Sequence, residues 1–333
     1  MSNNIKKILS IDSGASNIRI VIFDELGSTI FSDKINEGAN IAIDRENCTK
    51  QIIKVLSETL NKASLSYEDI NHFSIGVAGI SDESARELLF KRLEECKISN
   101  RTHLTTDVNP IFEMNCSDNS AILVSVGTGA ICLGRSTDDR IEKVGGAGLD
   151  IDPGSGFWMG KELLIKLSFN KNEEHNESEF DDLLNMTLNS FNTKELNLGI
   201  DQVMQSNDRY RKIASLSSGI LDLGENGNEI AISIIQQSSQ HIADMIIFLC
   251  DQISYINDDL ILIVNGSIMN NEFFRKSLSD ALIFDFSSIK WLFPNISSAY
   301  YPGLLSAKML GMKVTINDLI ENGAQQLLSL IHI

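Results

Sequence analysis

Residues 7–35 read KILSIDSGASNIRIVIFDELGSTIFSDKI and contain three apolar runs separated by turn residues. The runs cover Lys7–Asp12, Asn17–Asp24 and Thr29–Ile35, and their alternating, β-branched composition predicts three strands joined as a meander. Residues 121–144 read AILVSVGTGAICLGRSTDDRIEKV and repeat this pattern, roughly 115 residues further along the chain. The sequence therefore predicts an internal duplication.

Each meander is followed by alternating helix and strand signals, so the order βββαβαβα occurs twice. After the first meander we expect a helix at 45–63, a strand at 72–78, a helix at 84–95 and a strand at 101–106. After the second we expect a helix at 229–250, a strand at 259–264, a helix at 271–282, a strand at 288–293 and a helix at 301–310. This order predicts an α/β protein of two duplicated domains, each a mixed five-stranded sheet, around a central cleft.

The expected domain boundaries follow from the two copies. The first domain is expected over residues 1–117 and the second over 118–315, with extra helices inserted at about 157–215. A separate amphipathic helix at 316–333 is expected to pack on the first domain.

The composition argues against several classes of function. With 28 Lys and Arg against 45 Asp and Glu, the net charge is −17, which disfavours binding to nucleic acid or to an anionic membrane. No window approaches the roughly 18 apolar residues of a membrane span, and the apolar run Ile8–Ile11 is too short for a secretion signal. The five cysteines are scattered without a CxxC pair, as is typical of reduced thiols. We therefore expect a cytoplasmic protein.

Two turns carry the pattern of phosphate-binding loops. Asp12-Ser13-Gly14-Ala15-Ser16-Asn17 lies between the first two expected strands, and Ser125-Val126-Gly127-Thr128-Gly129-Ala130 lies at the same place in the second meander. Consecutive backbone N–H groups in such a turn can converge on an anion, and Asp12 can hold a hydrated Mg²⁺. One such turn alone is more typical of a plain hairpin. Two at equivalent positions of a duplication predict a polyphosphate site.

Asp107 is the candidate for proton transfer. It follows the strand expected at 101–106 and precedes a helix, so it either caps that helix or acts as a general base on a bound hydroxyl. A single carboxylate suits phosphoryl transfer to an alcohol, in which positioning and charge neutralisation do most of the catalysis.

Two further segments are candidates for ligand contact. Residues 145–156 carry five glycines, which indicates special backbone angles or close approach to a ligand. In the same segment, Asp152 and Ser155 could instead cap the following helix. Asn265-Gly266-Ser267 follows an apolar strand and is either a ligand site or an ordinary strand–helix connection.

Together these segments resemble the sugar kinase branch of the actin/hexokinase/heat-shock-protein ATPase superfamily. The most similar group is the N-acetylglucosamine kinases of the BadF/BadG/BcrA/BcrD-type ATPase family. The resemblance covers residues 5–312 and rests on motifs in the family's order, namely Asp12–Asn17, Asp107, Gly127–Gly129, Gly145–Gly156 and Val264–Ser267. It implies two ribonuclease H-like (actin-like ATPase) domains, ATP and Mg²⁺ as cofactors, and an amino sugar as substrate.

The resemblance also implies roles for individual residues. Asp107 would be the catalytic base, and Asp12 would hold Mg²⁺ through water. The implied nucleotide-binding residues are Gly14, Ser16, Asn17, Gly127, Thr128, Gly129, Gly266 and Asn270. The implied substrate-binding residues, besides Asp107, are Asn40, Ala130, Gly145, Gly146, Ala147 and Asp152.

The chain departs from the family pattern near the sugar. The family usually reads Gly-Asp-Glu-Gly-Ser where this chain has Ile151-Asp152-Pro153-Gly154-Ser155, and Ala147 stands where the animal enzyme has Trp. In the adenosine motif, Asn265 replaces the first of two frequent glycines. The expected reaction is phosphorylation of N-acetyl-D-glucosamine to its 6-phosphate. Glucosamine and N-acetylmuramic acid remain alternative acceptors, because the altered loop could change the specificity.

Two other functions remain open. An ATPase that activates a radical dehydratase, also known in this family, would need cysteines for an iron–sulfur cluster, whereas Cys116 and Cys132 lack paired spacing. The other is a sugar sensor without turnover. Related repressors carry a DNA-binding helix-turn-helix ahead of the first strand, and none is expected here. The family is often dimeric, so a homodimer is one expected assembly; the sequence decides neither the oligomeric state nor the donor range.

Overall fold

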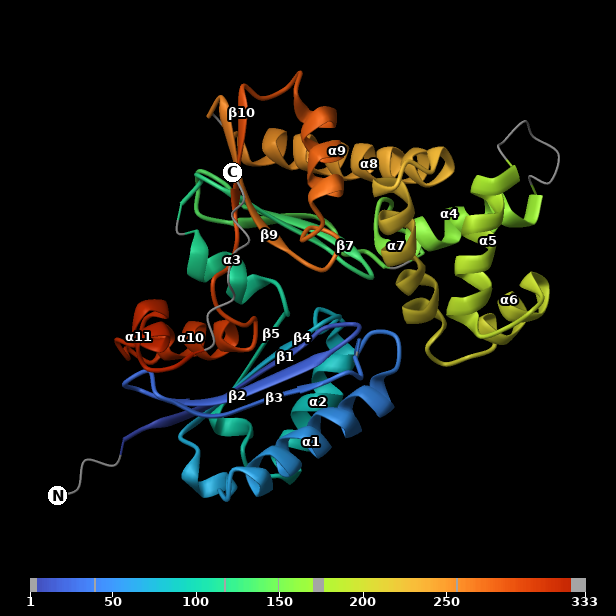
Figure 1. Cartoon of the computed structure of the whole chain (residues 1–333). Helices are drawn as coiled ribbons and strands as arrows, with labels where there is room; N and C mark the ends of the chain where they lie inside the picture. Colours follow the sequence, from blue (N-terminus) through green and yellow to red (C-terminus); the bar gives the residue numbers. More distant parts are fainter. Residues whose placement is uncertain are drawn as a thin grey trace. The chain divides into compact units, whose positions relative to one another are not determined.

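The computed structural model describes residues 5–38, 40–116, 118–148, 150–169, 177–255 and 257–324. The chain forms two compact units, each built around a mixed five-stranded sheet (Figure 1). The first unit takes in the described residues up to 116 together with those from 294 onward, and the second spans Asp118–Phe293. The predicted fold class of two domains with five-stranded sheets is thereby confirmed, and the cleft between them stays a prediction.

The sheet of the first unit has the strand order β3-β2-β1-β4-β5. The predicted meander forms antiparallel pairs between β1 (Lys7–Ser13), β2 (Ile18–Asp24) and β3 (Thr29–Ile35). On the other side of β1, strands β4 (His72–Val77) and β5 (Thr102–Thr105) run parallel to it. Because β1, β4 and β5 are parallel, the residues that follow them emerge at one edge of the sheet.

Helices α1 (Arg45–Lys62) and α2 (Glu83–Glu95) pack on one face of this sheet. Their apolar residues, such as Leu56 and Leu89, share a core with Ile11 and Ile75 of the strands. Each helix begins at an aspartate whose side chain accepts a backbone N–H, as aspartate favours at this position. Short 3₁₀ turns at Tyr67–Asp69 and Ser99–Arg101 lead into β4 and β5.

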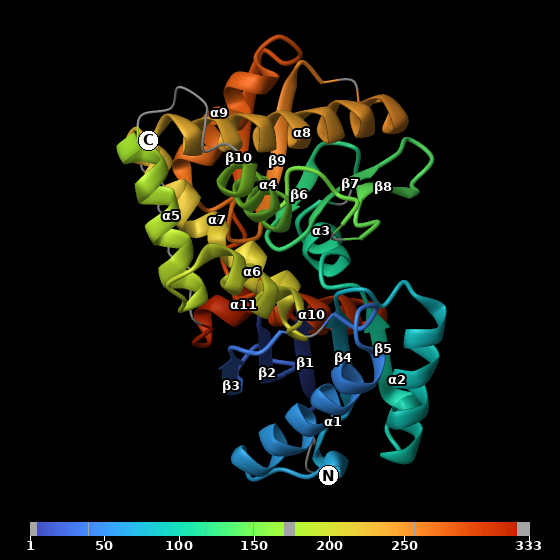
Figure 2. The same cartoon turned by 90° about the vertical axis from the view of Figure 1, so that its right-hand side faces the viewer.

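Helix α10 (Tyr300–Met309) contacts β1 and β4 of the first unit (Figure 2). Small residues allow the close approach: Ser10 Oγ accepts the Gly303 N–H at 2.8 Å, and Ser74 Oγ donates to the Pro302 carbonyl at 2.6 Å. A Cβ on Gly303 would lie 2.9 Å from Ser10 Cβ. Residues 294–315 therefore belong to the first unit, whereas the sequence placed them in the second domain.

Helix α11 (Ile316–Glu321) also lies on the first unit. Just beyond it, Asn322 Nδ2 donates to the Leu26 carbonyl in the turn between β2 and β3, at 3.1 Å. Of the helix predicted at 316–333, the part after residue 324 lies outside the described residues.

The sheet of the second unit repeats the topology of the first, with the order β10-β9-β6-β7-β8. Its meander is β6 (Ile122–Val126), β7 (Ala130–Arg135) and β8 (Ile141–Gly145), all paired antiparallel. Strands β9 (Asp259–Asn265) and β10 (Ser288–Leu292) run parallel to β6. The predicted duplication is thus present in the hydrogen-bonded order of the strands.

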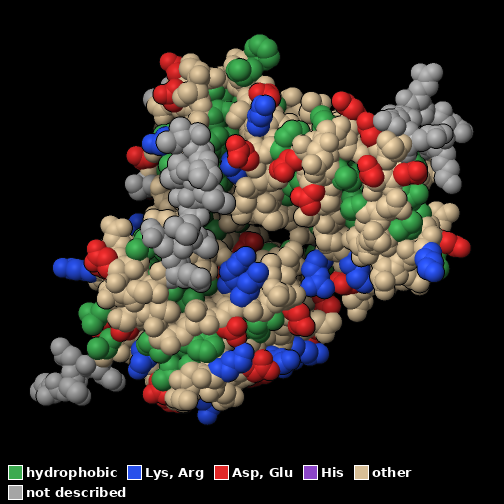
Figure 3. Space-filling view, viewed as in Figure 1, with side chains coloured by type: hydrophobic (Ala, Val, Ile, Leu, Met, Phe, Trp, Pro, Cys, Tyr) green, Lys and Arg blue, Asp and Glu red, His purple; other side chains and the backbone are tan. Residues whose placement is uncertain are grey.

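The helices of the second unit are α4 (Gly156–Phe169), α5 (Glu177–Phe191), α6 (Leu196–Met204), α7 (Arg209–Glu225), α8 (Glu229–Ile253) and α9 (Glu272–Leu282). Helices α4–α7 form the predicted insertion, which continues to residue 225 rather than 215. Helix α8 packs on β7 and β8 with Ile242 and Leu249 fully buried. None of the helices in the described ranges combines the length and apolarity that crossing a bilayer requires. Acidic and basic side chains are intermixed on the face shown in Figure 3.

Candidate functional site

Asp107 lies directly after β5, between that strand and helix α3 (Asn109–Asn115). It is not the cap of this helix: the N-cap residue is Val108, and the hydroxyl of Thr106 accepts the Asn109 N–H at 3.0 Å. A glycine on the neighbouring strand makes room, because a Cβ on Gly76 would lie 3.5 Å from Asp107 Cα. The Asp107 carboxyl is therefore available for chemistry rather than for capping.

The environment of Asp107 favours its protonated form. Burial, followed by the negative charge of Asp12, raises the pKa of Asp107 from 3.8 to about 7, and the N–H groups of Asp107 and Val108 oppose this shift. Desolvation disfavours the charged carboxylate, and a like charge nearby acts in the same direction. A carboxyl that titrates near neutral pH is suited to general base catalysis.

Asp12 is 5% exposed, at the carboxyl end of β1. Its Oδ2 accepts hydrogen bonds from Ser298 Oγ and, at 3.5 Å, from Arg19 Nη1. Burial raises the pKa of Asp12, while Ser298 and Arg19 lower it. Neither partner is among the residues predicted from the sequence. Arg19 could have been found, since it lies opposite Asp12 in the hairpin register, but Ser298 is 286 residues away and leaves no local signal.

The residues around Asp12 fit the Mg²⁺ that the family implies, in its water-mediated form. All hydrogen bonds that the described residues make to this carboxylate go to Oδ2, so Oδ1 still has acceptor capacity. Nowhere in the described ranges do three His, Cys, Asp or Glu side chains gather as a metal cage. Mg²⁺ commonly keeps several waters and is held by one or two carboxylates plus substrate phosphates, so a single aspartate suffices.

The first candidate phosphate loop begins at the end of β1. It closes as a tight turn in which the Gly14 N–H donates to the Asn17 carbonyl at 3.0 Å. Ser16 and Asn17 are partly exposed on this loop. Gly38 lies against it so closely that a Cβ there would be 2.0 Å from the Ala15 carbonyl oxygen. The loop, Asp12 and Asp107 all lie at the carboxyl edge of the first sheet.

Asn40 lies at the same edge. It forms a parallel bridge with Ala78, which directly follows β4. Its Oδ1 accepts the Ala42 N–H at 3.0 Å, so this side-chain oxygen holds the local turn. The amide Nδ2 can still donate to a ligand. The structure thus gathers Asp12, Gly14–Asn17, Asn40 and Asp107 within the first unit.

The second candidate phosphate loop follows β6 and is held by hydrogen bonds from the start of α4. Gly156 N–H donates to the Gly127 carbonyl at 2.8 Å, and Phe157 N–H donates to the Thr128 carbonyl at 3.2 Å. The Gly127 N–H donates to the Gly129 carbonyl at 2.9 Å. A Cβ on Gly127 would meet nothing within 4 Å. This open space is where a ligand could approach the backbone.

The glycine-rich segment after β8 is held by Asp152. Its carboxylate accepts the N–H groups of Ala147 and Gly148, both at 3.1 Å, and burial raises its pKa. Gly145 and Gly146 both have positive φ, which confirms that this segment needs special backbone angles. Asp152 therefore orders the loop through its own carboxylate oxygens.

Ala130 links this loop to the phosphate loop. Its carbonyl accepts the Gly146 N–H at 2.9 Å, and its side chain is 3% exposed. Both its backbone oxygen and its methyl group are thus engaged inside the protein. Among the sugar-binding residues that the resemblance implies, Ala130 and Asp152 are both buried.

The connection between β9 and α9 completes the second group. Gly266 has φ +92°, and a Cβ there would lie 2.2 Å from the Val126 carbonyl oxygen, so this turn packs directly on the end of β6. Asn265, which replaces a family glycine, donates from Nδ2 to Ser125 Oγ at 2.9 Å. Asn270 is exposed next to the N-cap of α9. The predicted nucleotide residues of the second unit therefore lie around the ends of β6 and β9.

The chain is similar in sequence and in fold to known kinases. A protein from Clostridium acetobutylicum named N-acetylmuramic acid/N-acetylglucosamine kinase is 24% identical over 284 residues, covering 83% of this chain and 91% of that protein. A candidate N-acetylglucosamine kinase from Chromobacterium violaceum has a TM-score of 0.69 at 17% identity, over 91% of this chain and 99% of that one. A candidate N-acetylglucosamine kinase from Porphyromonas gingivalis has a TM-score of 0.65 at 18% identity, and the match covers 91% of this chain and 98% of that one.

The model of the BadF/BadG/BcrA/BcrD ATPase family matches residues 9–288, which is most of the chain and includes every loop described above except the segment around Ser298. The predicted family resemblance is confirmed: this chain belongs to the BadF/BadG/BcrA/BcrD ATPase family.

Proposed function

We propose that this protein is an ATP- and Mg²⁺-dependent kinase of an amino sugar, with N-acetyl-D-glucosamine as the favoured acceptor and the 6-phosphate as product. The observation that carries the proposal is Asp107, a carboxyl with a pKa of about 7 that lies beside Asp12 and does not cap its helix. The kinase names of similar proteins support the same reaction class.

Each group of residues has a distinct task in this reaction. Asp107 takes the proton of the acceptor hydroxyl as its oxygen bonds to the γ-phosphorus of ATP, while the bond from that phosphorus to the β–γ bridging oxygen breaks and ADP leaves. The backbone N–H groups of the two phosphate loops orient the polyphosphate of ATP. Asp12 would hold Mg²⁺ through water, and the ion would supply positive charge against the phosphates. Asp152 fixes the conformation of the glycine-rich loop that would contact the sugar, because its carboxylate accepts hydrogen bonds from two backbone N–H groups of that loop.

The choice of sugar is the least constrained part of the proposal. The Clostridium acetobutylicum relative is named for two acceptors, N-acetylmuramic acid and N-acetylglucosamine. Ile151 and Pro153, on either side of Asp152, differ from the family pattern. A panel of N-acetylglucosamine, N-acetylmuramic acid, glucosamine and glucose, assayed by coupled ADP release, ranks the acceptors by kcat/KM. If none of these sugars is phosphorylated above the rate of ATP hydrolysis, the proposal is overturned.

Asp107→Asn tests the base directly. We expect a fold-preserving variant that still binds ATP but turns over ~10²–10⁴ times more slowly, the usual contribution of a positioned base. Asp82→Asn is the matched control, because Asp82 caps α2 and asparagine also caps well. Near-normal turnover in Asp107→Asn, or equal losses in both variants, would remove Asp107 from the mechanism.

The rival functions have less support. A dehydratase activator needs cysteines that can reach a cluster, whereas Cys116 is 5% exposed and Cys132 is fully buried. A non-catalytic sensor would bind the sugar in the same panel without releasing ADP. We further propose a cytoplasmic protein that acts on small molecules; sedimentation analysis would decide whether it is a homodimer.

A further inference from the structure

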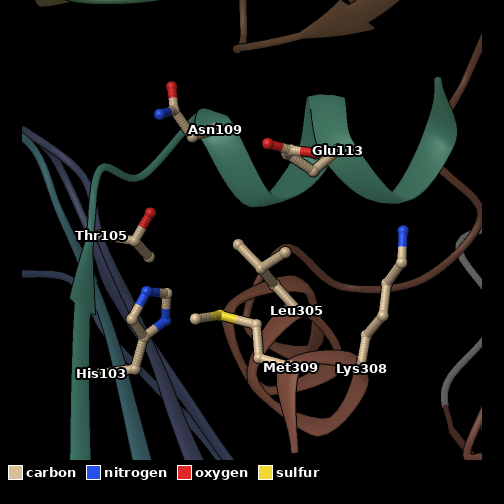
Figure 4. Close-up of a pocket in the computed structure, with 7 residues that line it drawn as sticks. All are labelled: His103, Thr105, Asn109, Glu113, Leu305, Lys308 and Met309. Carbon is tan, nitrogen blue, oxygen red and sulfur yellow. The ribbon is translucent and has the colours of Figure 1, made fainter. Parts of the chain in front are cut away.

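A cavity of about 570 Å³ lies in the first unit. It is lined by His103, Thr105, Asn109, Glu113, Leu305, Lys308 and Met309, from β5, α3 and α10 (Figure 4). Its size is in the range of small-molecule sites. None of these residues belongs to the predicted nucleotide or sugar site.

The walls of the cavity differ in chemistry. Glu113 on α3 and Lys308 on α10 bring opposite charges to one part of it, and the polar groups of His103, Thr105 and Asn109 lie at another (Figure 4). Leu305 and Met309 lie between them and supply apolar surface. Lys308 is exposed and makes no ion pair within the part of the chain that the structure describes. A ligand with both an ammonium and an anionic group would match this pattern.

Buried hydrogen bonds fix the strands and helix that form the cavity. Ser306 Oγ of α10 lies 3.1 Å from His103 Nδ1 and 2.7 Å from Ser74 Oγ. Ser74 Oγ donates to the Pro302 carbonyl. This chain of bonds ties β4, β5 and α10 together, so the walls that β5 and α10 form are held in place before a ligand binds.

The cavity flanks the segment that carries the proposed base. Thr105 precedes Asp107 by two residues, and Asn109 follows it by two. A ligand that contacts both residues bridges β5 and the start of α3. Binding would therefore change the freedom of the connection that positions the Asp107 carboxyl.

We propose that this cavity is a regulatory site for a small zwitterion, whose ammonium pairs with Glu113 and whose anionic group pairs with Lys308. Its hydroxyl groups would bond to Thr105 and Asn109. Such chemistry occurs in phosphorylated amino sugars and in free amino acids. The binding stands on the cavity alone, and the effect on turnover rests on the proposed kinase function.

Calorimetry on the full chain tests the binding, with glucosamine 6-phosphate and L-serine as the two probes. We expect at least one to bind in the presence of the saturating acceptor sugar, so that the acceptor site is occupied. Glu113→Gln and Lys308→Met should each weaken that binding about 5- to 10-fold, as expected for loss of a charged partner at a partly exposed site. Glu87→Gln and Lys313→Met, exposed residues of the same unit outside the cavity, are matched controls.

The outcomes separate this proposal from the kinase assignment. Binding of glucosamine 6-phosphate alone identifies a phosphorylated amino sugar as the ligand class, and binding of L-serine alone identifies an amino acid. If neither binds at about ten millimolar, or if the cavity variants bind as tightly as the controls, the site is overturned.

In the ADP-release assay, the bound probe should change kcat at saturating sugar in the wild type and not in Lys308→Met. A probe that binds through Glu113 and Lys308 in a protein without kinase activity leaves the site standing and overturns the proposed function.

Discussion

Asp107 is a residue whose charge the folded protein disfavours. Folding raises the pKa of Asp107 from its ordinary value of 3.8 to about 7. Between these two pH values, the folded chain therefore holds a proton that the unfolded chain has released. Stability therefore falls as the pH rises from about 4 to about 7. Functional sites are commonly less stable than they could be, because activity requires a residue that lowers the free energy of unfolding.

Replacing Asp107 by asparagine should stabilise the protein in a pH-dependent way. The neutral amide avoids the desolvation of a carboxylate and the repulsion from Asp12. We expect Asp107→Asn to raise Tm more at pH 8 than at pH 5, as measured by calorimetry. Asp82→Asn should not show this gain, since hydrogen bonds lower the pKa of Asp82. Equal Tm shifts of Asp107→Asn at both pH values would contradict the raised pKa.

At the scale of elements, the sequence predicts most strands to within two residues, because alternation and β-branched composition are local signals. Strand β3 was expected at Thr29–Ile35 and is found there. The partners of the site were harder to predict. The bonds of Asp12 to Ser298 and of Ser10 to α10 join positions nearly 300 residues apart, and a single sequence carries no local trace of them. Thr106 rather than Asp107 accepts the bond at the start of α3, because a neighbouring hydroxyl serves equally well.

The two loop glycines of the second unit should respond differently to the same substitution. Gly127→Ala places a methyl group in open space, so stability should change by no more than ~0.5 kcal/mol while ATP binding weakens. In Gly266→Ala, the alanine would have to adopt φ +92°, and its Cβ would lie 2.2 Å from the Val126 carbonyl oxygen. This substitution should therefore lower the free energy of unfolding by ~1–3 kcal/mol. Denaturant unfolding and nucleotide calorimetry measure both effects. Unchanged ATP affinity in Gly127→Ala would count against a phosphate-binding role for that loop.

At the scale of the whole molecule, the two units differ in how the chain builds them. The second is one continuous stretch, Asp118–Phe293, whereas the first needs both an early segment and the segment from residue 294 onward. The returning α10 covers the face of β1 and β4 that carries Ser10 and Ser74, and the residues just before it supply the Ser298 partner of Asp12. Asp12 and the strand that leads into the candidate phosphate loop therefore depend on residues from late in the sequence.

Truncation after Phe293 should destabilise the first unit and leave the second unit folded. Without α10, the first unit loses the buried hydrogen bonds of Ser10 and Ser74. It also exposes apolar side chains such as Phe23, whose ring centroid lies 5.8 Å from that of Tyr300, so the unit should open. The second unit keeps its complete sheet and core. Limited proteolysis with mass spectrometry should then find early cuts in the strands and helices of the first unit and protection of those of the second, with the full chain as control. Early cuts spread equally over both units would show that the second unit depends on the first, and protection of 5–116 would show that α10 is dispensable to its fold.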